Sequence, residues 1–139
     1  MKGACLCGSV TFKIEEPIRN LYQCHCSLCR KATGAAANAA TFVQRAAFHW
    51  LSGEGLITSY KRKSGFRSDF CSICGSPVPN NVSNSSMVWI PAGLLEEPVA
   101  SQVSVHLHTR SAAPWERESA ECIRLEGGAN SLASLNNLL

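Results

Sequence analysis

Cys71-Ser72-Ile73-Cys74-Gly75 is the segment on which the architecture depends, because it supplies half of a tetrahedral metal site and needs another segment for the rest. Two cysteines separated by two residues are common in zinc turns, and the glycine frees the backbone just after the second cysteine. A second pair, Cys5 and Cys7, stands close to the N-terminus. Cysteines two apart on a strand point to the same face, so this pair is expected to lie on a strand and to bind the same ion. The pattern predicts a closed four-cysteine site that joins the N-terminal strand to the middle of the chain.

The remaining cluster consists of three cysteines within six residues, Cys24, Cys26 and Cys29. These side chains can bind one face of a metal ion without help from elsewhere. Closed zinc sites use four protein ligands, whereas catalytic sites use three and keep one position open, so the sequence predicts one zinc of each kind. The alternative is a second structural zinc completed by a histidine, for which the chain offers His25, His49, His106 and His108. His25 stands between two ligands and is expected to support them or to lie at the surface.

Disulfide bonds are the competing use of the eight cysteines, and they require an oxidising compartment. The chain enters its first cysteine cluster directly after Met1, with no apolar signal segment, and no later stretch has the length of a membrane span. We therefore expect a cytoplasmic protein with reduced thiols that bind metal and with no membrane partner. Cys122 stands alone and is expected to be a buried free thiol.

The charge of the chain gives little reason to expect a nucleic-acid partner. The formal net charge is +3. A zinc ion with four thiolates carries −2 and one with three carries −1, so the metal-loaded chain would be close to neutral. Lys61-Arg62-Lys63 is the only dense basic run, and it is expected to form a solvated loop tip.

Alternating and β-rich segments separated by turn residues predict a mainly β protein with a single domain over residues 1–139. A turn at Gly34 followed by a strand is expected within residues 32–40, and residues 131–138 form either a short helix or a frayed end. The expected strands cover residues 10–14, 41–43, 56–60, 66–70, 87–90 and 103–108.

Three blocks resemble the signature blocks of the glutathione-dependent formaldehyde-activating enzyme and centromere protein V family. They are Gly3-Ala4-Cys5-Leu6-Cys7-Gly8-Ser9-Val10, Cys24-His25-Cys26-Ser27-Leu28-Cys29-Arg30-Lys31-Ala32-Thr33-Gly34 and Phe70-Cys71-Ser72-Ile73-Cys74-Gly75-Ser76. Shorter matches occur in the same order, in Ser52-Gly53-Glu54, Pro91-Ala92-Gly93-Leu94-Leu95, and His106 followed by Ser111-Ala112-Ala113-Pro114-Trp115. The resemblance therefore covers nearly the whole chain.

The resemblance implies a largely β, Mss4-like fold stapled by two zinc ions per chain, one structural and one catalytic. It also implies that Cys24, Cys26 and Cys29 hold the catalytic zinc of a carbon–sulfur lyase-type enzyme. This enzyme would join glutathione, its cosubstrate, to formaldehyde or a related aldehyde and give S-hydroxymethylglutathione. Arg30 and Lys31 follow the last ligand and are expected either to contact the glutathione carboxylates or to be solvated at the surface. Two alternatives remain open, a non-catalytic carrier of glutathione or another thiol and a zinc-stapled interaction module, and the chain could also form a homo-oligomer.

Overall fold

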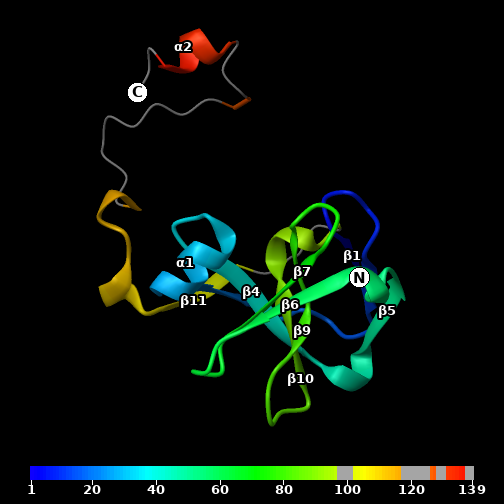
Figure 1. Cartoon of the computed structure of the whole chain (residues 1–139). Coiled ribbons are helices and arrows are strands. Elements are labelled where there is room, and N and C mark those ends of the chain that lie inside the picture. The colour runs from blue at the N-terminus through cyan, green and yellow to red at the C-terminus, as the bar shows by residue number, and fades with distance from the viewer. Residues whose placement is uncertain (97–101, 117–125, 128–130, 137–139) are drawn as a thin grey trace.

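A computed structural model describes residues 1–96, 102–116, 126–127 and 131–136, which form three small sheets and few helices (Figure 1). The first sheet has the strand order β1-β2-β5, the second β11-β3-β4-β10-β9 and the third β6-β7-β8. All pairs are antiparallel except β11 with β3, which is parallel. The strands are β1 (Lys2–Ala4), β2 (Thr11–Ile14), β3 (Leu21–Cys24), β4 (Asn38–Gln44), β5 (Phe48–Ser52), β6 (Ile57–Lys61), β7 (Arg67–Cys71), β8 (Pro77–Val78), β9 (Asn80–Asn81), β10 (Met87–Pro91) and β11 (Val103–Leu107).

The helices are short. The two α-helices are α1 (Ser27–Thr33) and α2 (Leu132–Asn136). Single 3-10 turns lie between strands at η1 (Arg45–Ala47), η2 (Glu54–Leu56) and η3 (Ala92–Leu94), and two more follow β11, η4 (Thr109–Ser111) and η5 (Pro114–Glu116). Within the described ranges, no helix is long and apolar enough to cross a membrane.

The main core lies between the first sheet and one face of the five-stranded sheet. Strand β2 alternates, so that Phe12 and Ile14 point inward and are almost fully buried. They pack against Val43 on β4 and against Val88 and Ile90 on β10. Burying a side chain of this size contributes about 1.5–3 kcal/mol, so these five residues are a major source of stability.

The opposite face of the five-stranded sheet is not used for this core. Cys24 on β3 lies directly opposite Asn38 on β4, and Phe42 lies opposite Trp89 on β10. Because side chains alternate along a strand, these residues and Tyr22 share one face, and the register gives the other face to the core. The sheet therefore separates a packed core from a face on which a site can form.

The predicted mainly β fold is confirmed, and each of the six predicted strand segments overlaps a strand. The expected turn at Gly34 is also confirmed, because Gly34 has a positive φ of 66° and β4 begins at Asn38. Lys61 ends β6, and Arg62 and Lys63 follow in the turn before β7, so this basic run is exposed to solvent as predicted. The terminal segment contains α2. Cys122 lies outside the described residues.

The expected strand at Cys5 and Cys7 is wrong. Strand β1 ends at Ala4, and both cysteines lie in the loop that connects it to β2. The N–H of Gly8 donates to the Cys5 carbonyl at 2.9 Å, and the N–H of Cys5 donates to the Val10 carbonyl at 3.0 Å. These hydrogen bonds close a tight turn, which brings the two thiols to one side by folding back the backbone.

Candidate metal centres and the adjoining cavity

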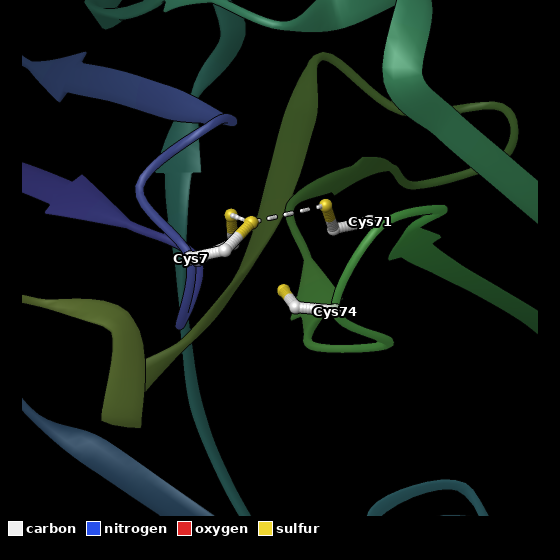
Figure 2. Close-up of side chains that lie close together, drawn as sticks. Cys7, Cys71 and Cys74 are labelled. Atoms are coloured by element: carbon white, nitrogen blue, oxygen red, sulfur yellow. Dashed lines mark hydrogen bonds between the residues drawn. The ribbon is translucent and has the colours of Figure 1, made fainter.

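The four-cysteine cluster joins two loops from distant parts of the chain. Cys5 and Cys7 come from the β1–β2 loop, Cys71 ends β7, and Cys74 follows in the turn before β8. Figure 2 shows the side chains of Cys7, Cys71 and Cys74 pointing toward one another. Cys7 Sγ lies 3.6 Å from Cys5 Sγ and 3.9 Å from Cys71 Sγ, and all four sulfurs lie within 4.8 Å of one another. Four sulfurs at about 2.3 Å from a tetrahedral zinc lie about 3.8 Å apart, so this cluster has the geometry for zinc.

Hydrogen bonds to the backbone fix the two loops. The N–H of Leu6 donates to Ser76 Oγ at 3.0 Å, which links the β1–β2 loop to the turn after Cys74. The N–H of Gly75 donates to the Cys71 carbonyl at 2.8 Å, and this turn requires the positive φ of 74° that glycine adopts readily. The predicted role of Gly75 in the turn is therefore confirmed.

The surroundings of the four thiols differ. Ser76, through its hydroxyl and its backbone N–H, lowers the pKa of Cys74 to about 5, and Ser9 lowers the pKa of Cys7 in the same way. Burial raises the pKa of Cys5. A cluster with two readily ionised thiols can bind a cation and then release the remaining protons, as metal–thiolate sites do.

The three-cysteine cluster is built around the start of α1. Cys24 ends β3, Cys26 is the N-cap of α1, and Cys29 lies in its first turn. The N–H of Cys29 donates to Cys26 Sγ at 3.4 Å, so one thiol both caps the helix and faces the other ligands. The three sulfurs lie within 4.8 Å of one another. The residues can hold one metal ion by three thiolates, as the spacing predicts.

The thiols of this cluster also differ in acidity. Burial, reinforced by the neighbouring thiols of Cys24 and Cys26, raises the pKa of Cys29. Burial opposes ionisation of Cys26 too, yet the backbone N–H of Cys29 and the adjacent thiols lower its pKa. Burial raises the pKa of Tyr22 to about 12, with a smaller contribution from Cys29 and Cys24. The phenol of Tyr22 is therefore neutral at physiological pH.

His25 does not join the cysteines. Its side chain is only 5% exposed, with Nδ1 at 2.7 Å from Glu116 Oε1 and Nε2 at 2.9 Å from His106 Nδ1. Its backbone N–H donates to the Leu107 carbonyl at 2.9 Å. Among the described residues, no histidine belongs to either metal-ligand cluster. His25 is thus a buried residue that fixes the segment between two ligands to β11 and η5, and the expected alternative of a surface position is wrong.

A cavity of about 360 Å³ opens beside the three-cysteine cluster. Cys24 and Cys29 line it, together with an aromatic group from the free face of the sheet, Tyr22, Phe42 and Trp89. The Tyr22 and Phe42 rings stack at 5.4 Å, and the indole N–H of Trp89 donates to the Tyr22 hydroxyl at 2.8 Å. The size is in the range of small-molecule sites, which are largely apolar with a few polar groups.

Asn38 is a polar residue that the pairing of β3 with β4 places beside the three-cysteine cluster. It lies directly opposite Cys24, and directly opposed side chains on antiparallel strands stand about 4.5–5.5 Å apart at Cβ. Asn38 lines the cavity and is 8% exposed, yet its carboxamide has no hydrogen-bond partner among the described residues. A nearly buried amide in the lining of a cavity, without a partner of its own, is available for a ligand.

Arg30 and Lys31 lie on α1 outside this cavity lining. The Nε–H of Arg30 donates to the His25 carbonyl at 3.3 Å, and Lys31 is exposed. Their predicted contact with glutathione stays a prediction. Sequence reasoning did not find Tyr22 or Phe42, because only the strand register brings these residues beside the cysteines.

The comparisons with known proteins agree with this arrangement. The family model described as glutathione-dependent formaldehyde-activating enzyme matches residues 1–111. The chain belongs to this family. A search of curated proteins gave no match. Among solved structures, a Rhodobacter sphaeroides protein from a structural genomics programme is similar, with 24% identity and a TM-score of 0.59 over 74% of this chain and 100% of that one.

The family match includes all seven described cysteines. It confirms the predicted membership in the formaldehyde-activating family, and the likeness to the Rhodobacter protein shows a shared fold. The prediction of one domain over residues 1–139 stays a prediction, because the family match ends at residue 111.

Proposed function

We propose that this protein is a zinc-dependent carbon–sulfur lyase-type enzyme that adds the thiol of glutathione to formaldehyde or a related aldehyde. The observation that carries the proposal is a cluster of three cysteines, two of which line a cavity, with no fourth protein ligand among the described residues. Three protein ligands are typical of catalytic zinc, whereas the cluster of Cys5, Cys7, Cys71 and Cys74 has the four ligands of a structural site. Membership in the family supports glutathione and an aldehyde as the substrates.

A zinc ion bound by Cys24, Cys26 and Cys29 would supply an open position for a thiol and lower its pKa, so that the thiolate is available at neutral pH. The residues around the cavity would exclude water and orient the two substrates. The aromatic group of Tyr22 and Phe42 excludes water from the reacting atoms. Arg30 and Lys31 are proposed to contact the glutathione carboxylates from the α1 side.

Asn38 is suited to orient the aldehyde. In the addition, the sulfur forms a bond to the carbonyl carbon, and the electron pair of the C=O π bond moves to the oxygen. The Asn38 N–H groups can donate to this oxygen as its negative charge develops, which is the role of an oxyanion-hole donor. The oxygen then takes a proton from water, and the proton of the thiol is released to solvent. The product is the hydroxymethyl thioether.

A non-catalytic glutathione carrier is the second candidate, and one observation favours it. The described cavity lining contains no histidine, carboxylate or lysine that could act as a general acid or base. The same site could therefore bind glutathione without accelerating its reaction. We further propose a cytoplasmic location and two zinc ions per chain, bound with different strength.

Cobalt substitution tests the proposed function, because a new thiolate ligand changes the sulfur-to-metal absorption. Glutathione should change the spectrum of the cobalt protein, and S-methylglutathione, which cannot present a thiolate, should not. The change should disappear in Cys26→Ala. Equal responses to the two ligands would refute thiolate binding. If glutathione binds but the rate of adduct formation is the same with and without protein, the carrier function is correct.

A further inference from the structure

A second cavity, of about 410 Å³, is lined by residues of all three sheets. Strand β5 of the first sheet, β9 and β10 of the second, and β6 and β7 of the third contribute to its wall. None of the seven cysteines that form the two clusters lies in this lining. The second cavity is therefore distinct from the cavity beside Cys24 and Cys29, although Arg67, Asn80 and Asn81 line both.

One part of the second cavity is an aromatic wall. Phe48 and Trp50 stand two apart on β5 and share a face, and their rings meet edge to face at 4.8 Å. Phe12 packs against the other side of this pair, with its ring centroid 6.1 Å from that of Trp50. Val88 adds an aliphatic group, and its neighbour Trp89 lines the other cavity because side chains alternate along β10. The apolar wall is thus held in place by the main core.

The polar part is an ion pair on β7. Ser59 on β6 lies directly opposite Asp69, and Arg67 precedes Asp69 by two residues, so the three side chains share one face of the third sheet. The Arg67 Nε–H donates to Asp69 Oδ1 at 2.7 Å, and Nη2 donates to Asp69 Oδ2 and, at 3.4 Å, to Ser59 Oγ. Asp69 and Ser59 line the second cavity and not the first. The guanidinium of Arg67 therefore belongs to the second cavity.

This ion pair leaves one part of the guanidinium unused. The Asp69 side chain is 3% exposed, and burying a charged pair costs desolvation that its attraction often fails to offset. Stability alone therefore does not account for the pair. Asp69 occupies the edge formed by Nε and Nη2, whereas Nη1 makes no hydrogen bond among the described residues. A guanidinium held by two contacts is a preorganised donor, and the group that matches its charge and its planar N–H groups is a carboxylate.

We propose that the second cavity is a binding site for a small organic acid, whose carboxylate accepts hydrogen bonds from Arg67 Nη1 and whose apolar body packs against Trp50. Its volume is in the range of small-molecule sites, which combine an apolar wall with a few placed polar groups. Arg45 and Glu54 also line this cavity, are exposed and have opposite charges, so together they give no preference for either sign. The proposal does not rest on the proposed function, since it involves neither a thiol nor a metal ion.

The three tryptophans of the chain report on separate places, which makes the test specific. Trp50 lines the second cavity, Trp89 lines the cavity beside the cysteines, and Trp115 is 69% exposed and lines neither. Their indole N–H signals can be followed by NMR on ¹⁵N-labelled protein and assigned with Trp50→Phe and Trp89→Phe. The two ligands are 3-phenylpropionate and 3-phenylpropanamide, which have the same shape and differ in charge. The acid should shift the Trp50 signal to saturation and bind about tenfold more tightly than the amide.

The informative variant is Arg67→Gln/Asp69→Asn. It removes the cation and its buried partner together, and it leaves the net charge of the protein unchanged. It should bind acid and amide with equal affinity, close to that of wild type for the amide. Arg67→Lys keeps a cation beside Asp69 but has no Nη1, and should lose most of the preference. Arg62→Gln is the matched control, because it removes an exposed arginine outside both linings and should keep the tenfold preference.

Each other outcome overturns the inference. A shift of Trp89 instead of Trp50 would place the acid in the cavity beside the cysteines. Equal affinity of wild type for acid and amide would show that Arg67 does not recognise the carboxylate, and a Trp50 signal that does not saturate would show that there is no site. The inference is also wrong if the double variant, folded as judged by unchanged Trp89 and Trp115 signals, keeps the full preference. None of these results bears on glutathione binding, which the cobalt spectrum measures separately.

Discussion

Cys71→Ala should destabilise the protein far more than Cys26→Ala. Cys71 is fully buried and belongs to the cluster that joins loops 64 residues apart in sequence. Structural zinc contributes about 10–16 kcal/mol in small zinc domains, and an equal share for each of four ligands is about 3 kcal/mol. Domains of this size have a total stability of about 5–15 kcal/mol, so a loss of about 3 kcal/mol lowers Tm by roughly 10 °C.

Cys26→Ala is the matched comparison, because it also removes one thiolate from a metal cluster. Its cluster spans only residues 24–29, so it closes no long loop of the chain. We expect Tm to change by less than about 3 °C, since the core between β2 and the five-stranded sheet does not depend on it. Thermal unfolding followed by circular dichroism on zinc-loaded proteins gives both values.

Measurement of Tm in excess chelator distinguishes the loss of a metal ligand from the loss of side-chain packing. Removing the buried Cys71 sulfur also leaves a small cavity, which costs about 1 kcal/mol whether or not metal is bound. In excess chelator, wild type and Cys71→Ala should therefore differ by only a few degrees. A difference that stays near 10 °C without metal would mean that Cys71 acts through packing. A larger loss in Cys26→Ala than in Cys71→Ala would show that the structural and open sites have been exchanged.

Three further predictions follow from the same geometry. Asn38→Ala should lower the rate of adduct formation by about 100-fold, as the loss of an oxyanion-hole donor does, while glutathione affinity measured on the cobalt protein stays within about twofold. Glu116→Ala should lower the free energy of unfolding by about 1–3 kcal/mol, because it leaves Nδ1 of the buried His25 without its partner. Glu116→Gln keeps an acceptor and should lower the free energy of unfolding less. Equal losses in the two variants would contradict this. Partial chelation that empties the three-cysteine cluster should increase amide hydrogen exchange in α1 and leave β4 and β10 protected. The reason is that α1 has only seven residues, none of them buried. An equal increase of exchange in α1, β4 and β10 would contradict this prediction.

The grouping of the cysteines could be predicted because ligand spacing is a local property of the sequence. Cys71 and Cys74 are separated by one turn, and Cys24, Cys26 and Cys29 lie within a span of six residues, so each set is brought together by a few backbone dihedral angles. The division of seven cysteines into a site of four and a site of three followed from the number of protein ligands in closed and open zinc sites. The fold class was also predictable, since alternation in β2, as at Phe12 and Ile14, requires only neighbouring residues.

The cavity could not be predicted because it depends on strand register. Tyr22, Phe42 and Trp89 come from three strands, and a shift of one residue in the pairing would send each side chain to the core face. Asn38 lies in an alanine-rich stretch, and only the strand register places it opposite Cys24. The placement of Cys5 and Cys7 failed for a different reason, since spacing by two fits both a strand face and a tight turn, and the hydrogen bond from Gly8 to Cys5 selects the turn.

The two clusters differ in how much of the chain depends on each metal. Cys5 and Cys7 meet Cys71 and Cys74 beside Val10 and Val78, which are fully buried, so this site forms part of a second core and holds the β1–β2 loop against the third sheet. The three-cysteine cluster instead holds a short helix against β4, and two residues of that helix, Ala32 and Thr33, line the cavity. A metal ion in the first cluster would therefore support the fold, whereas one in the second would position a wall of the cavity. Because the two clusters lie in separate parts of the fold, loss of an ion from the second cluster is expected to disorder α1 and the cavity wall while the rest of the fold is retained.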